Sequence, residues 1–275
     1  MLPSLLLTYA VNNNTNLRLG GSQTVNRPEF RELAEYNVFD YDNYVAVRGN
    51  PDLVRATTGN ADLRYEWFPA AGEIISASVF YKYFTNPIEQ VNKGNDILSY
   101  QNASHASSYG VELELRKKLD FITGAFFDKL IFYANAAYIK GSVKFGDLNV
   151  NSPLQGQSPY LVNGGLNYTN SLFSVNLLYN RIGPRLKFRA IGGGALNIFE
   201  KPRDVVDLQI GKSFLDKKLE LKLTISDLFA QPYTWYYKYE VNPSNTGYKA
   251  ANDKIMNTVR YGTTATLGIK YNFGR

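Results

Sequence analysis

Apolar and polar residues alternate one by one in many segments of this sequence. The segment 109–115 reads YGVELEL, so apolar and acidic residues take turns along it. Successive side chains of a β-strand point to opposite faces. The apolar face would carry Val111, Leu113 and Leu115, and the charged face Glu112, Glu114 and Arg116. A soluble sheet buries its apolar face in a core, whereas a membrane barrel turns that face to lipid.

About eleven such segments follow one another along the chain. Their apolar faces start near residues 5, 17, 61, 75, 109, 131, 162, 173, 206, 219 and 265. No segment carries an apolar stripe of helical period over several turns. The pattern predicts an all-β chain, folded as an antiparallel meander of about eleven long strands. The last segment, 263–273, is long enough to span about 27 Å of hydrocarbon when it is tilted by about 40°.

The connections between these segments alternate between short and long. Turns such as 12–15 and 169–171 are short, whereas the long connections cover about 25–58, 86–106, 146–159, 187–202 and 231–257. Short turns at one end of the strands and long loops at the other are typical of a bacterial outer-membrane barrel. Aromatic residues near strand ends, among them Trp67, Phe84 and Tyr271, fit the aromatic girdles of the two membrane interfaces.

Composition limits the chemistry of the chain. It has no cysteine and one histidine, His105, which excludes a disulfide framework, a thiolate metal site and a histidine-rich zinc site. The net charge of +6 permits an anionic partner, but the basic residues are scattered and form no nucleic-acid-binding module. Mean hydropathy is −0.28, and no apolar run approaches the ~18–20 residues of a spanning helix. We therefore predict no cofactor, no metal site, no catalytic residue and no nucleic-acid partner.

The parity of the strands bears on domain organisation. If eleven strands end on the short-turn side, the first of them starts on the long-loop side. Single-chain outer-membrane barrels have an even number of strands and both ends in the periplasm. The N-terminus also lacks the basic region and cleavage site of a signal peptide. We therefore expect residues 1–275 to be one barrel domain, the C-terminal part of a longer protein that is truncated on the N-terminal side.

Several stretches resemble the latter half of a TonB-dependent outer-membrane receptor. SQTVNRPEFREL at 22–33, RGNPDL at 48–53 and YEWF at 65–68 come in the order and spacing of that family. The late strands of the family are similar to LQGQSPYLVNGGLNY (154–168), LLYNRIGPR (177–185), KPRDVVDLQIGKSF (201–214), LKLTISDLFAQPY (221–233) and TTATLGIKYNF (263–273). The resemblance covers essentially the whole chain.

This resemblance implies a fold, a location and partners. Such receptors are 22-stranded barrels of the bacterial outer membrane, so this chain would supply half of the barrel and no plug domain. They take up a nutrient actively, such as a siderophore or an oligosaccharide. The implied partners are outer-membrane lipid, the missing N-terminal strands and plug, and the TonB energy-coupling complex, which acts through the absent N-terminal segment. The chain alone is not expected to transport.

Three groups of residues are candidates for function. Charged residues expected to line the lumen and face the plug are Arg64, Glu66, Glu112, Glu114 and Arg116. Acid–base chemistry is the alternative for the last three of them. Loop residues expected to contact a ligand, with local ion pairs or loop packing as the alternative, are Arg27, Glu29, Arg31, Arg185, Arg189, Trp235 and Tyr236. Residues expected to face lipid are Val111, Leu113, Leu115, Leu219, Leu221, Leu223, Leu267 and Ile269.

Other functions stay open on the sequence alone. A complete, smaller outer-membrane barrel or adhesin would show the same alternation, and so would a soluble β-sandwich binding module. An outer-membrane lipase or protease is a further alternative. No serine–histidine pair is apparent around His105, so we do not expect an enzyme.

Overall fold

The computed structural model describes residues 2–41, 45–92, 97–146, 148–191, 195–215, 218–239 and 246–273. Parts of the predicted long connections, at 42–44, 93–96, 147, 192–194 and 240–245, lie outside the described residues, as do residues 216–217 of a predicted turn. Strands dominate the rest. The described helices are short, and none of them has the length and apolar character needed to cross a membrane.

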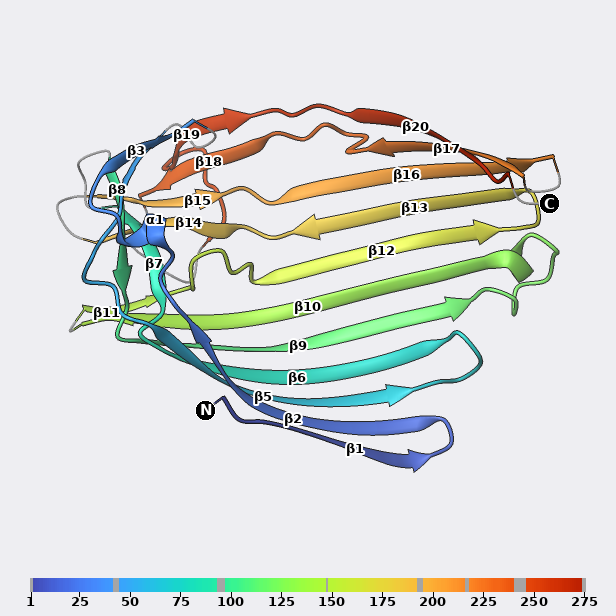
Figure 1. Ribbon diagram of the computed structural model, residues 1–275, viewed down its shortest axis with the longest axis horizontal. Coiled ribbons are helices and arrows are strands. Elements are labelled where there is room, and N and C mark those ends of the chain that lie inside the picture. Colours follow the sequence, from blue (N-terminus) through green and yellow to red (C-terminus); the bar gives the residue numbers. More distant parts are fainter. Residues whose placement is uncertain are drawn as a thin grey trace.

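Eleven long strands form one antiparallel sheet, in which each strand pairs with the next one along this path (Figure 1). The strands, in spatial order, are β1 Ser4–Asn12, β2 Thr15–Asn26, β5 Ala56–Trp67, β6 Ile74–Thr85, β9 His105–Lys118, β10 Leu130–Phe145, β12 Tyr160–Thr169, β13 Phe173–Ile182, β16 Arg203–Phe214, β17 Leu219–Ser226 and β20 Thr264–Tyr271. We call this sheet the wall. The predicted antiparallel meander of eleven strands is confirmed.

The register of the wall keeps apolar residues in line from strand to strand. Leu63 pairs with Val79, Val79 with Val111, and Val111 with Tyr138. The next row is polar, since Arg64 pairs with Ser78 and Ser78 with Glu112. Because side chains alternate along every strand, matched rows of this kind give the wall one apolar face and one polar face.

The long connections fold into a second sheet at one end of the wall, which we call the loop sheet (Figure 1). Its eight strands, in spatial order, are β19 Lys254–Val259, β18 Tyr233–Lys238, β15 Asn197–Glu200, β14 Arg185–Ala190, β7 Ile88–Asn92, β8 Ile97–Asn102, β4 Val45–Arg48 and β3 Asn37–Asp40. The smaller elements are α1 Phe30–Leu33, the 3₁₀ turn η1 Phe127–Lys129, and β11 Leu148–Ser152, which pairs with β10.

The loop sheet is a difference from the sequence-based expectation of loops. Its strands are only four to six residues long, so their alternation is too short to stand out in the sequence. Different connections meet through parallel pairs, β4 with β8 and β14 with β7. Pairs of this kind depend on where the wall places the connections, which local sequence does not encode.

The buried apolar core of the described residues lies at the loop-sheet end. One cluster joins five loop-sheet strands through Val45, Val47, Leu98, Phe188, Ile198 and Trp235. A second cluster fastens loop residue Val91 to wall residues Val143 and Phe145, with Phe84 packed against it. Loops therefore fold over the wall on the face that carries Phe84 and Val143, and we call this face the inner face. Phe84 was expected in an aromatic girdle, and that prediction is wrong because its position in β6 points inward.

Candidate functional site

The inner face of the wall carries a network of ion pairs. Arg18 Nε lies 2.8 Å from Glu66 Oε2, and Arg64 Nε lies 2.9 Å from Glu66 Oε1. Arg64, in β5, also reaches across β6 to β9, where its Nη2 lies 2.6 Å from Glu114 Oε2. Ser76 donates its hydroxyl to the same Glu114 oxygen. The side chain of Glu66 is 8% exposed, so the two guanidinium groups balance a nearly buried carboxylate.

The structure brings together three of the five predicted lumen residues, Arg64, Glu66 and Glu114. Glu112 and Arg116 lie on the same face but form no ion pair with any described residue. Arg18 was missed by sequence reasoning. Its position between Leu17 and Leu19 was the signal, because alternation in β2 sends it to the polar face.

Amide side chains continue the polar surface across the other half of the inner face. Asn163 Nδ2 donates to Asn135 Oδ1 at 2.6 Å, and Asn180 donates to Asn163. A second row, nearer the short turns, runs from Asn167 through Asn176 and Gln209 to Thr224. Such rows leave donors and acceptors available to whatever occupies the space beside the wall. Sequence reasoning missed them because single asparagines in strands give no pattern of their own.

On the inner face a tyrosine ring covers the space left by a glycine in the neighbouring strand. Tyr133 pairs with Gly165, and its ring covers the glycine so closely that a Cβ atom there would lie 2.4 Å from the ring. Gly165 is therefore required for the close approach of the ring.

The outer face holds the eight residues that were predicted to face lipid. They are Val111, Leu113, Leu115, Leu219, Leu221, Leu223, Leu267 and Ile269. Their rows are continuous across the sheet, and Leu267 and Ile269 are 65% and 69% exposed. A soluble protein rarely leaves so continuous an apolar surface uncovered. Contact of each of these side chains with lipid stays a prediction.

Aromatic residues border this apolar band on both sides. Near the loop sheet the outer face carries the tyrosines Tyr81, Tyr83, Tyr109, Tyr138 and Tyr179. Near the short turns it carries Tyr65, Trp67, Phe173 and Tyr271. The rings of amphipathic aromatic residues prefer the level of the headgroups. The band between the two borders therefore has the layout of a membrane-spanning surface.

The predicted ligand-contact residues of the later loops serve the packing of the loop sheet. Arg189 is 1% exposed and forms a bidentate ion pair with the buried Glu89 of β7. Trp235 and Tyr236 are 5% and 0% exposed. Arg185 is partly exposed and pairs with Glu200 at 2.8 Å. Loop packing was the alternative interpretation of Trp235 and Tyr236, and it accounts for the contacts of all four residues. Ligand contact by them stays a prediction.

Electrostatics in the loop sheet reflect this packing. Burial lowers the pKa of Lys187, whose ammonium lies 5.0 Å from the centre of the Trp235 ring. Burial raises the pKa of the Tyr236 hydroxyl, which donates to the Thr246 carbonyl. Burial works against the ionised form of Asp253 too, but hydrogen bonds from the Lys249 amide and the Lys238 ammonium hold the pKa of this carboxyl below its usual value. The loop sheet is therefore a folded unit that contains buried ion pairs.

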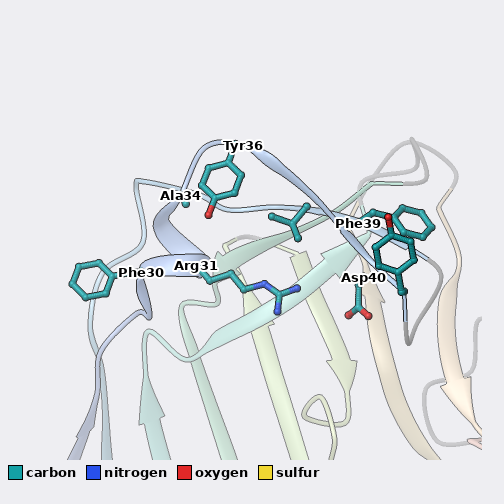
Figure 2. Close-up of a pocket in the computed structure, with 8 residues that line it drawn as sticks. Phe30, Arg31, Ala34, Tyr36, Phe39 and Asp40 are labelled. Carbon is teal, nitrogen blue, oxygen red and sulfur yellow. The ribbon is translucent and has the colours of Figure 1, made fainter.

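We call the loop-sheet end of the wall the mouth. The first long connection forms a pocket there, which we call the mouth pocket (Figure 2). It is lined by α1 and β3, mainly through Phe30, Arg31, Tyr36, Phe39 and Tyr41. Figure 2 shows the Arg31 side chain reaching from α1 toward Asp40, below Tyr36. The pocket lining combines aromatic rings, the Arg31 guanidinium and the Asp40 carboxylate, and such a lining is suited to a ligand that has flat and charged groups.

The three predicted residues of this connection differ in role. Arg31 lines the pocket and forms no ion pair with a described residue. Glu29 caps α1 and accepts a hydrogen bond from the N3 backbone, while the Glu32 carboxylate accepts one from the Glu29 amide at 2.9 Å. Arg27 is exposed and does not line the pocket. Of the three residues, Arg31 alone lines this pocket, and ligand contact by any of them stays a prediction.

Metal chemistry has no support among the described residues. They contain no group of three histidine, cysteine, aspartate or glutamate side chains that could hold a metal ion. His105 lies at the loop end of β9 and stacks on Tyr83, with 6.0 Å between ring centres. The candidate site consists of the inner face and the mouth pocket.

Solved structures that resemble this chain include siderophore receptors and an iron transporter. A variant of the ferric enterobactin receptor PfeA of Pseudomonas aeruginosa matches with a TM-score of 0.64 and 19% identity, over 98% of this chain and 40% of the receptor. The siderophore receptor PirA of Acinetobacter baumannii gives a TM-score of 0.62 and 18% identity, over 99% of this chain and 41% of that receptor. The FrpB iron transporter of Neisseria meningitidis gives 0.62 and 14%, over 98% and 39%.

The chain spans about two fifths of the length of these receptors. At such identities the likeness shows the fold, and the receptor-barrel fold implied by the sequence resemblance is confirmed. No curated protein sequence matches the chain significantly. The model of the outer membrane protein beta-barrel family, however, matches residues 1–262, which is nearly the whole chain. The chain therefore belongs to the outer membrane protein beta-barrel family and is located in the bacterial outer membrane.

Proposed function

We propose that the chain forms the barrel wall and extracellular loops of a TonB-dependent receptor that takes up a nutrient actively. The observation that carries this proposal is the inner face, a surface of ion pairs and amide rows that ends beneath a folded loop sheet. A wall with this surface suits a folded polar partner inside the barrel. In this proposal the partner is the plug, and the TonB complex acts on it from the periplasm.

The unpaired charges of the inner face are suited to plug contact. Glu112 and Arg116 lie on this face without an ion pair among the described residues, beside the saturated network of Arg64 and Glu114. A plug that offers opposite charges would pair with Glu112 and Arg116. The side chains of the neighbouring network are already ordered, so plug binding would cost little further side-chain entropy there.

The mouth pocket suggests the class of nutrient. Its rings and the Arg31 guanidinium suit a ligand with aromatic and anionic groups. Three similar solved structures are described as a ferric enterobactin receptor, a siderophore receptor and an iron transporter. We therefore favour a ferric siderophore over an oligosaccharide as the nutrient.

Uptake by cells tests the proposal. The gene is deleted and restored in its host, and the uptake of labelled ferric siderophores and oligosaccharides is measured with and without an energised inner membrane. We expect one class to depend on both the gene and the energy source. Passive entry that persists without energy would instead indicate a simple pore, and unchanged uptake together with lost surface attachment would indicate an adhesin.

Two variants in the same strain separate ligand contact from fold. Arg31→Ala should weaken binding of the nutrient roughly tenfold, since truncation of a central charged contact costs this much. Arg27→Ala is the matched control, an exposed arginine of the same connection that lies outside the pocket. Equal effects of the two substitutions would remove the mouth pocket from the proposal.

The proposal treats residues 1–275 as one barrel unit without transport activity of its own, and it assigns no catalytic step. Energised uptake into vesicles by residues 1–275 alone would contradict the expected lack of transport. Hydrolysis of a defined lipid or peptide by the purified protein would contradict the expected lack of catalysis.

A further inference from the structure

The turn between β9 and β10 has a more apolar surface than the polar turn at the same end of the wall. It covers residues 119–129 and reads LDFITGAFFDK. Phe121 is 69% exposed, Phe126 54% and Ile122 37%. The turn at 12–15 reads NNNT. An apolar surface is thus not needed to connect strands at this end, and the three side chains call for another explanation. We call Phe121, Ile122 and Phe126 the turn patch.

The backbone of this turn has a defined shape. The Ile122 amide donates to the Leu119 carbonyl at 3.0 Å, and the Phe127 amide donates to the Gly124 carbonyl at 2.9 Å. Gly124 has a φ of 138°, which a residue with a side chain rarely adopts. The turn continues into η1. It therefore presents its apolar side chains in a fixed arrangement.

The turn patch is continuous with the outer face of the wall. The Phe126 ring stacks on Tyr168, with 4.8 Å between ring centres. Tyr168 lies on the outer face, where it pairs with Leu130 on one side and Val175 on the other. The neighbouring turn adds Leu172, which is 57% exposed. The apolar surface thus extends from the membrane-facing wall onto the turns.

We propose that the turn patch inserts into the periplasmic leaflet of the outer membrane and contacts phospholipid at the boundary between headgroups and acyl chains. Short turns of such barrels lie on the periplasmic side. Aromatic rings favour that boundary, and apolar surface on it lies about 5–10 Å deep. The exposed Lys129 beside the patch can reach the phosphates. This anchor does not depend on the nutrient or on energy coupling.

A single introduced thiol tests the anchor, because the chain has no cysteine. Phe121→Cys is placed in the natural protein, which is purified from outer membranes and reconstituted in phospholipid vesicles. Asn13→Cys, in the polar turn at the same end, is the matched control. The unsubstituted protein shows the background. We expect a water-soluble thiol reagent to label Cys at 121 roughly tenfold more slowly than at 13, because lipid at the headgroup boundary shields the thiol at 121 from the reagent in water.

A second measurement reads the depth directly. A fluorophore on the same thiols is exposed to phospholipids that carry a quencher near the headgroup, and quenching should be strong at 121 and weak at 13. Correct folding of each variant is checked by its resistance to detergent at room temperature. Equal labelling rates and equal quenching at the two positions would overturn the proposal. Protection at 121 in native membranes but not in vesicles would overturn it too, since it would identify a protein partner in place of lipid.

Discussion

Single residues in this wall take their role from their parity along a strand. Arg18 is flanked by Leu17 and Leu19, yet its side chain lies on the opposite face and contacts Glu66. Glu112 and Leu113 are neighbours in sequence, but one faces the polar inside and the other the apolar outside. A charged residue is therefore tolerated at an inward-facing position of a strand and harmful at an outward-facing one, because the two faces meet media of very different polarity.

Substitutions at 113 and 112 test this parity. Leu113→Arg places a charge on the outer face, where it should cost about 2–4 kcal/mol near the bilayer midplane and lower the amount of folded protein in the outer membrane. Glu112→Gln keeps a polar group on the inner face and should be mild. Membrane fractions of the two variants are compared by heat-dependent mobility on gels. If the two substitutions exchanged their severity, the assignment of the faces would be wrong.

Short strands of the loop sheet behave differently from the long strands of the wall. Their stability comes from buried contacts between connections that are far apart in sequence. Arg189 of β14 and Glu89 of β7 form one such contact, and both side chains are almost completely buried. Arg189 also donates to the Pro153 carbonyl at 2.6 Å. The pair therefore ties three connections together.

Removal of one partner of this pair should loosen the loop sheet. Arg189→Met leaves the Glu89 carboxylate buried without its counter-charge, which should cost about 3–5 kcal/mol of local stability. Hydrogen exchange of residues 86–92 and 185–190 should rise, while exchange in the wall stays slow. The double substitution Arg189→Met with Glu89→Met serves as the control and should restore much of the loss. Unchanged exchange in the single variant would show that the pair does not hold the loops.

The whole molecule is a wall with two unlike faces and a core confined to one end. Buried apolar clusters of the described residues gather at the loop-sheet end, whereas the middle of the long strands carries exposed apolar residues on the outer face and hydrogen-bonding residues on the inner face. The edge strands of the wall are β1 and β20, and each has a neighbour on one side only among the described strands. Exposed edges of this kind pair readily with other strands.

Residues 1–275 expressed without detergent should therefore associate. Both the apolar outer face and the free strand edges favour aggregation, and detergent or lipid should reduce it. Light scattering and size-exclusion chromatography of the purified chain, with and without detergent, measure the effect. A stable monomer in plain buffer would support a soluble binding module and contradict the membrane assignment.

The wall could be predicted from local sequence patterns. Alternation marks the long strands, less cleanly in β10, where Ile131, Phe132 and Tyr133 are all apolar. Alternation also separates the inner residues Arg64, Glu66 and Glu114 from outer residues such as Leu113 and Leu267. Periodicity is a local property, so no tertiary information is needed to see it. Strand order followed as well, because short turns join neighbouring antiparallel strands.

The loop sheet and the partners within each face of the wall depend on long-range contacts that are visible only in the folded protein. The burial of Arg189, Trp235 and Tyr236 depends on connections that meet across the mouth, and pairs such as Glu89 with Arg189 are separated by 100 residues. Arg18 joined the ion-pair network because the register placed it opposite Arg64, from where it reaches Glu66 diagonally. Strands of four to six residues and contacts over long sequence separations carry too little local signal to be read from the chain. Their geometry exists only once the wall has brought them together.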